Sequence, residues 1–242
     1  MIKVPRTIVP SFFTIANMFF GFLAILYAFN STDFVRSSWL IILAAFMDSM
    51  DGRVARFTGT SSKFGVEYDS LADVVSFGLA PSVLIYLYYF HNWGTVGVFI
   101  SFFPLLFASI RLARFNVELE GFEKKAFTGL PSPASAIAIA SYFIFMAAYL
   151  PNHLFPKYLL VLVLTVCVLM VSTIRYEVMP KLTFKGDLWQ KIGFLIVILI
   201  VILLIVNPQL FIFPLILLYI LSGLIRFVIR LGQGKRLGGR GI

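Results

Sequence analysis

Long apolar runs constrain this chain more than any other feature. Eight stretches rich in Leu, Ile, Val, Phe and Ala are close to the length of a membrane-spanning helix, which is about 17–25 residues. They cover residues 8–29, 38–57, 66–90, 93–115, 131–150, 157–174, 191–206 and 209–229. Only 13% of the residues are charged, against about a quarter in soluble domains. The sequence therefore predicts an all-α fold, a polytopic integral membrane bundle of about eight transmembrane helices.

The basic residues predict the orientation of this bundle. If the N-terminus is cytoplasmic, all of the 20 Lys and Arg residues except Arg36 and Lys157 lie on the cytoplasmic side, as the positive-inside rule requires. Both termini are then cytoplasmic, and the net charge of +9 needs no nucleic-acid partner. The first run is too long for the apolar region of a cleaved signal. We expect residence in a prokaryotic cell membrane, with the basic tail against its lipid head groups.

The chain is predicted to form a single membrane domain over residues 1–242. The longest polar stretches, 116–130 and 175–190, both fall on the cytoplasmic side, where we expect any chemistry to occur. The only cysteine, Cys167, lies within an apolar run. This excludes an intrachain disulfide and a cysteine-rich metal site.

Acidic residues interrupt the second run at "MDSMDGRVARF", residues 47–57. At about 100° per residue on a helix, Asp48, Asp51, Gly52 and Ala55 share one face, with Arg56 at its edge. The third run begins with a similar face, because Asp69 and Asp73 are one turn apart. Small residues accompany this second pair on the same side of the helix: Gly65, Ala72, Ser76 and Ala80. Two helices joined by a short turn would thus direct four carboxylates into one cleft.

Carboxylates inside a membrane are costly and mark functional sites by default. The alternative is a set of structural salt bridges with Arg53, Arg56 and Lys63, but four acids would then meet only three bases. Oxygen ligands alone suit Mg²⁺, Mn²⁺ or Ca²⁺. Two such ions among four aspartates would form the bimetal arrangement used for phosphoryl chemistry. Arg56 offers a forked donor to a diphosphate, and Gly52 leaves room for it.

The spacing Asp48-x2-Asp51-Gly52-x2-Ala55-Arg56-x8-Gly65-x3-Asp69-x3-Asp73 resembles the complete signature of the CDP-alcohol phosphotransferases. The resemblance implies a homodimeric membrane enzyme with a six-helix catalytic core, here about residues 8–175. The helices at about residues 191–229 would be additional to this core, without an assigned role. Such enzymes transfer a phosphatidyl group from a CDP-linked lipid to an alcohol and release CMP.

The resemblance also implies roles for the signature residues. Asp48, Asp51, Asp69 and Asp73 would bind two divalent ions, Mg²⁺ or Mn²⁺, and Asp73 would act as the general base. The implied contacts to the CDP-lipid are Gly52, Ala55, Arg56, Ser62 and Gly65, with Thr14 and Asn17 as further candidates. For Thr14 and Asn17 an interhelical hydrogen bond is an equal alternative. Ser11 departs from the pattern, because relatives more often have asparagine there.

Further blocks resemble the serine-specific members of the family. They cover residues 9–22, 69–82, 111–116 and 129–136. The expected reaction transfers the phosphatidyl group of CDP-diacylglycerol or CDP-archaeol to the hydroxyl of L-serine. Candidates for binding serine or the lipid phosphate are Arg111, Arg114, Asn116 and Arg175, although membrane anchoring is an alternative for the arginines.

Other functions stay open at this point. The same chemistry could act on glycerol 3-phosphate or inositol phosphate, which would demand a larger basic pocket. An acidic cleft could also belong to a divalent-cation transporter, but transporter sites lie near the bilayer midplane, whereas these aspartates lie near cytoplasmic helix ends. A non-catalytic scaffold would show neither activity.

Overall fold

The computed structural model describes residues 11–30, 34–58, 63–120, 129–151, 155–174, 176 and 188–237. Within these residues every regular element is helical and none is a strand. In chain order the elements are α1 (Phe12–Ala28), α2 (Phe34–Thr58), α3 (Lys63–Asp73), η2 (Val74–Leu79), α4 (Ala80–Tyr88), η3 (Phe90–Trp93), α5 (Gly94–Glu120), α6 (Ser132–Tyr149), α7 (Pro156–Val171), α8 (Leu188–Val206) and α9 (Pro208–Leu237). Each predicted apolar run coincides with one of these helices or with consecutive ones, so the all-helical prediction is confirmed.

Four helical stretches are long and apolar enough to cross a bilayer. They are Lys63–Tyr88, Phe90–Val117, Ser132–Tyr149 and Pro208–Ile229. The apolar helices Phe12–Ala28, Pro156–Val171 and Ile192–Val206 are shorter. The length and composition of the helices therefore agree with an integral membrane protein.

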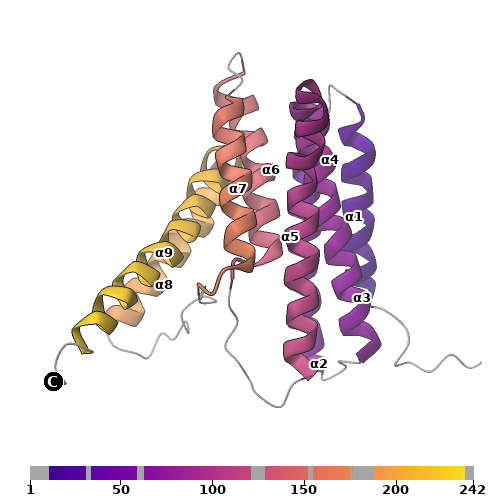
Figure 1. The fold of residues 1–242 in the computed structure, drawn as a ribbon. Coiled ribbons are helices and arrows are strands. Elements are labelled where there is room, and N and C mark those ends of the chain that lie inside the picture. The colour runs from indigo at the N-terminus through magenta and orange to yellow at the C-terminus, as the bar shows by residue number, and fades with distance from the viewer. Residues whose placement is uncertain are drawn as a thin grey trace, which may run out of the picture.

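The helices form a bundle with α6 at its centre (Figure 1). α1 packs along α2, whereas α6 contacts α2, α7 and α9, and α8 packs on α9. The buried face of α6 includes many small side chains: Ala134, Ser135, Ala136, Ala138, Ala140 and Ser141. Small residues let membrane helices approach closely. Figure 1 shows α8 and α9 leaning away from the other helices.

The third apolar run is not one regular helix. α3 ends at Asp73 and continues into the π-helical turn η2, where the Ala80 amide donates to the carbonyl of Val75, five residues earlier. Such turns are rare and occur frequently at functional sites. The sequence predicted an uninterrupted span over residues 66–90, and the wider turn directly after Asp73 is a feature that the apolar pattern does not show.

The segment before α6 is tied to the end of α7. The amides of Gly129 and Leu130 donate to the carbonyls of Ile174 and Leu169, at 2.8 and 2.9 Å. Gly129 has φ +89°, and a Cβ there would lie 2.2 Å from the carbonyl oxygen of Met170. Only glycine fits this close approach. The contact fixes where α6 begins, and therefore where Ser132 lies.

Candidate active site

Three carboxylates from two helices meet toward the end of the bundle where α2 finishes and α3 begins. Asp48 of α2 and Asp69 and Asp73 of α3 offer carboxylate oxygens that lie within 4.8 Å of one another. Asp73 is only 7% exposed. Like charges this close repel one another in a poorly solvated place. A bound cation would relieve that repulsion.

Two oxygen atoms at this cluster have no hydrogen-bond partner among the described residues. They are Oδ1 of Asp69 and Oδ1 of Asn17, and both are buried. Buried polar atoms are nearly always paired, so each exception needs an explanation. Carboxylate and amide oxygens are the ligands that Mg²⁺ and Mn²⁺ prefer. The residues present therefore fit a hard divalent cation.

Asp73 is held by α1. The Asn17 Nδ2 group donates a hydrogen bond of 3.0 Å to Asp73 Oδ1, and both residues are buried. The backbone of Asn17 is fixed in turn, because its carbonyl accepts a 2.9 Å hydrogen bond from Ser76 Oγ in η2. One helical turn further on, a Cβ at Gly21 would lie 2.3 Å from Ser76 Oγ. The small residue lets α1 and η2 approach, and this contact positions Asn17.

Asp51 lies beside the three-carboxylate cluster with different partners. Its carboxylate accepts hydrogen bonds from the hydroxyls of Ser11 and Thr14 on α1. Its charge still acts on Asp48 and Asp69. The structure thus places Asp51, predicted as a fourth metal ligand, next to the cluster and bonded to α1. Thr14, predicted as a CDP-lipid contact, forms the interhelical bond that was its alternative.

Arg111 approaches the cluster from α5. Its Nη1 group donates a hydrogen bond of 3.3 Å to Ser132 Oγ at the start of α6. Its Nε is buried and has no hydrogen-bond partner among the described residues. The opposite charges of Arg111 and Asp73 attract each other. Arg111 is therefore a base near Asp73 that the salt-bridge alternative did not name. The salt-bridge alternative had instead named Arg53 and Lys63, together with Arg56.

Two of the other candidates for binding serine or the lipid phosphate lie where helices contact one another. Arg114 is exposed, and its Nη1 group donates a hydrogen bond of 3.1 Å to the carbonyl of Val171. Asn116 accepts from Ser70 and donates to Glu67, each at 3.1 Å, which ties α5 to α3. Arg175 lies outside the described residues.

The remaining CDP-lipid candidates lie at the α2–α3 corner. Gly52 is exposed, and a Cβ there would meet nothing within 4 Å, so this face of α2 is open. Gly65 is half-buried in the first turn of α3. Ala55 and Arg56 belong to α2, but their side chains lie outside the described part of the structure, as does Ser62.

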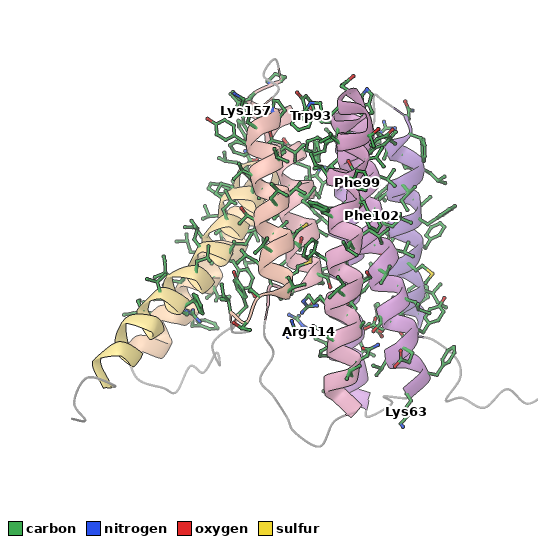
Figure 2. All side chains as sticks on the ribbon, viewed as in Figure 1. Lys63, Trp93, Phe99, Phe102, Arg114 and Lys157 are labelled. Carbon is green, nitrogen blue, oxygen red and sulfur yellow. The ribbon has the colours of Figure 1, made fainter. Side chains whose placement is uncertain are left out.

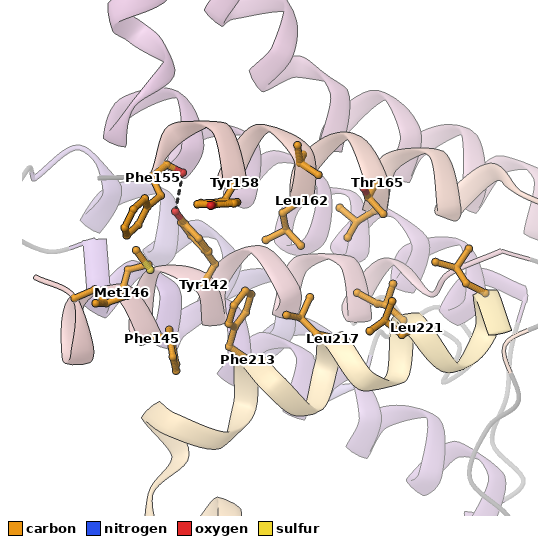
Figure 3. Close-up of a pocket in the computed structure, with 15 residues that line it drawn as sticks. Tyr142, Phe145, Met146, Phe155, Tyr158, Leu162, Thr165, Phe213, Leu217 and Leu221 are labelled. Carbon is orange, nitrogen blue, oxygen red and sulfur yellow. Dashed lines mark hydrogen bonds between the residues drawn. The ribbon is translucent and has the colours of Figure 1, made fainter. Parts of the chain in front are cut away.

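An apolar cavity of about 550 Å³ lies elsewhere, between α6, α7 and α9 (Figure 3). Its lining includes Tyr142, whose hydroxyl donates a hydrogen bond of 3.0 Å to the carbonyl of Phe155. Among the described residues its lining holds no carboxylate and no basic side chain. These residues offer a diphosphate no charged partner, so the aspartate cluster is the stronger candidate for an active site.

Three serine hydroxyls shape this site through contacts that sequence reasoning did not predict. They belong to Ser11, Ser76 and Ser132, which contact Asp51, Asn17 and Arg111. The sequence had placed Ser76 on the face of Asp69 and Asp73, and had marked Ser11 only as a departure from the family pattern. Their contacts join separate segments and depend on tertiary packing.

Comparisons with known proteins identify the family of this chain. The family model described as CDP-alcohol phosphatidyltransferase matches residues 7–164. The CDP-diacylglycerol–serine O-phosphatidyltransferase of Helicobacter pylori strain J99 is 37% identical over 230 residues, which cover 93% of this chain and 92% of that protein. The enzyme of the same name from Methanocaldococcus jannaschii is 36% identical over 176 residues, 73% of this chain and 77% of the relative.

A third relative carries a different name. The archaetidylserine synthase of Methanothermobacter thermautotrophicus is 36% identical over 169 residues, which cover 69% of this chain and 68% of that protein. The family match includes all four aspartates of the signature and the helices α1 to α6 that surround them. This chain belongs to the CDP-alcohol phosphatidyltransferase family.

Proposed function

We propose that this protein transfers the phosphatidyl group of a CDP-linked lipid to the hydroxyl of L-serine and releases CMP. The observation that carries the proposal is the cluster of Asp48, Asp69 and Asp73, in a chain whose relatives are named for transfer to serine or for archaetidylserine synthesis. These names differ in the lipid and agree in serine. The donor is therefore CDP-diacylglycerol or CDP-archaeol.

In the proposed mechanism Asp73 is the general base. The serine oxygen attacks the phosphorus on the lipid side of the diphosphate, and its proton passes to the Asp73 carboxylate. A bond forms between serine oxygen and phosphorus while the bond from that phosphorus to CMP breaks. The Asn17 amide holds one oxygen of Asp73, which fixes the direction of the carboxylate. Proton transfer to a positioned side chain contributes about 10²- to 10⁴-fold to a rate.

The four aspartates are the proposed ligands of two divalent ions, with Asp51 held beside the cluster by Ser11 and Thr14. Bound Mg²⁺ or Mn²⁺ would supply charge stabilisation for the diphosphate and for the departing CMP. Arg56 is proposed to bind the diphosphate and Arg111 the serine carboxylate, since a guanidinium matches both groups. The open face at Gly52 leaves space for the nucleotide.

We also propose eight spans in one membrane domain, a six-helix catalytic core ending at α7, a homodimer and cytoplasmic termini. Figure 2 supports this orientation, because Lys63 and Arg114 lie toward one end of the bundle, and Trp93 and Lys157 toward the other. The aspartates lie on the helices nearer the Lys63 end. The reaction would then occur at the cytoplasmic face of the membrane.

The test uses purified protein in detergent with CDP-diacylglycerol and each alcohol in turn, following CMP release. We expect release with L-serine and Mg²⁺ or Mn²⁺, no release after EDTA, and recovery when the metal is restored. Rapid release with glycerol 3-phosphate or inositol phosphate and none with serine would overturn the serine assignment. Full activity in EDTA would overturn the metal assignment while leaving the acceptor unaffected.

A further inference from the structure

The apolar cavity between α6, α7 and α9 is open on the outside of the bundle. Its volume of about 550 Å³ is more than three times that of the ~150 Å³ apolar cavity known to bind benzene in another protein. Three of its lining side chains, Tyr158, Val161 and Leu221, are 67%, 62% and 49% exposed. Both α6 and α9 are long and apolar enough to cross a bilayer. The open side of the cavity therefore faces lipid hydrocarbon.

The cavity lies in the half of the bundle away from the aspartates. Ser132 begins α6 and bonds Arg111 beside the aspartate cluster. The lining residues on α6 start ten residues later, at Tyr142, which is about 15 Å further along the helix axis. The hydrocarbon core of a bilayer is about 30 Å thick. The cavity is thus at the depth of the leaflet opposite the active site, whereas the CDP-lipid must have its diphosphate at the aspartates.

A lysine marks the end of the bundle on the side of the cavity. Lys157 is exposed in the first turn of α7, and Figure 2 shows it at the end opposite Lys63. Val161, which lines the cavity, lies four residues later and therefore on the same helix face. Helix side chains tilt toward the N-terminus, and lysines near the ends of membrane helices extend to the interface. The Lys157 ammonium group therefore lies between the cavity and the membrane surface.

We propose that the cavity binds one hydrocarbon chain of a phospholipid from the leaflet opposite the active site, with the lipid phosphate at Lys157. A chain fits the apolar lining, and it restores van der Waals contacts that an empty cavity would leave unmade. The lysine complements the charge of the phosphate. This site goes beyond the proposed function and does not depend on serine transfer.

The bound chain would join helices from two parts of the molecule. Figure 3 shows Leu162 of α7 and Leu217 of α9 on facing sides of the cavity, with α6 between them. Helix α9 lies beyond residues 7–164, which the family model matches. The lipid would therefore hold α9, and α8 packed on it, against the rest of the bundle.

The first test measures lipid binding to purified, delipidated protein in an uncharged detergent by native mass spectrometry. The two probes are dioleoylphosphatidylglycerol and dioleoylglycerol, which has the same chains without the phosphate. We expect one phosphatidylglycerol per chain and about fivefold weaker binding of dioleoylglycerol, as for one lysine near an anionic lipid surface. Lys157→Gln should remove this difference. Lys63→Gln is the matched control, because Lys63 is exposed in the first turn of α3 at the other end of the bundle, and it should preserve the difference.

The second test fills the cavity. Leu217→Trp places a larger side chain within it and should weaken binding of both lipids at least tenfold, with the KM for CDP-diacylglycerol within twofold of wild type. Leu221→Trp, at the exposed mouth, should give the same result and guards against a folding defect in the first variant. Ile202→Trp on α8 is the control, because Ile202 is 50% exposed and is not part of the lining; its lipid binding should match wild type.

Three results would overturn the inference. The first is wild-type phosphatidylglycerol binding in both Leu217→Trp and Leu221→Trp. The second is a raised KM for CDP-diacylglycerol in these variants, which would assign the cavity to the donor. The third is a wild-type dimer without bound lipid that becomes a monomer in Leu217→Trp, which would assign the cavity to a second copy of this chain. A wild-type protein that binds the lipid as expected but releases no CMP with serine would contradict the proposed function and support the lipid site.

Discussion

Asn17 of α1 donates a 3.0 Å hydrogen bond to Oδ1 of Asp73 on α3, and both side chains are buried. Groups that orient a metal ligand or base typically contribute about 10- to 100-fold to affinity or activity. We therefore expect Asn17→Ala to lower kcat for CMP release by about 10- to 100-fold at saturating serine and metal.

Asn92→Ala is the control for this variant, because Asn92 is exposed and its amide donates to the carbonyl of Tyr89 in the same turn. Its kcat should stay within twofold of wild type. If Asn17→Ala matched this control, Asp73 would not depend on α1 for its orientation.

The Asp51 carboxylate should depend on Thr14 in a similar way. Thr14→Val keeps the shape of the side chain but removes one of the two hydroxyls that bond Asp51. We expect activity to fall about 10-fold, the effect of about 1.4 kcal/mol, together with a higher Mn²⁺ concentration for half-maximal rate. Thr165→Val, on the wall of the apolar cavity, should change neither value. Equal metal dependence in both variants would contradict a role for Thr14 at the metal site.

The close approach of α1 to η2 makes a prediction about stability. In Gly21→Ala the added Cβ would lie 2.3 Å from Ser76 Oγ and 2.7 Å from Ser76 Cα. Overpacking of this kind typically costs about 1–3 kcal/mol, so the melting temperature in detergent should fall by several degrees. Gly193→Ala on α8 meets nothing within 4 Å and should melt at or slightly above the wild-type temperature. A Gly21→Ala protein that melts like wild type would show that α1 and η2 separate readily.

The helices could be predicted from the sequence because their signal is local. Runs of apolar residues set their positions, and the 3.6-residue period placed Asp48 with Asp51 and Asp69 with Asp73. The partners of those aspartates could not be predicted in this way. The bond from Asn17 to Asp73 and the contact of Arg111 with Ser132 join segments 56 and 21 residues apart. Such pairs depend on how helices pack, which periodicity within one helix does not determine.

The π-helical turn after Asp73 is another feature that the apolar pattern of the sequence does not predict. Residues 74–79 are as apolar as a regular span requires, and the wider turn is seen only in the hydrogen bond from Ala80 to Val75. The bonding of Asp51 to Ser11 and Thr14 is similarly a property of the α1–α2 interface. Sequence reasoning therefore identified the acidic face, and named Thr14 and Asn17 as candidates for interhelical hydrogen bonds, but it did not predict which aspartates they contact.

The most direct test of the central claim is the turnover of Asp73→Asn. The variant keeps the size of the side chain and an oxygen for the metal, but it cannot accept the serine proton. We predict that kcat for CMP release from CDP-diacylglycerol and serine falls about 10³-fold, within the range expected for a general base, and that raising Mn²⁺ does not restore it. Asp48→Asn, by contrast, should recover in part at high Mn²⁺. Turnover of Asp73→Asn within tenfold of wild type would contradict the assignment of Asp73 as the base.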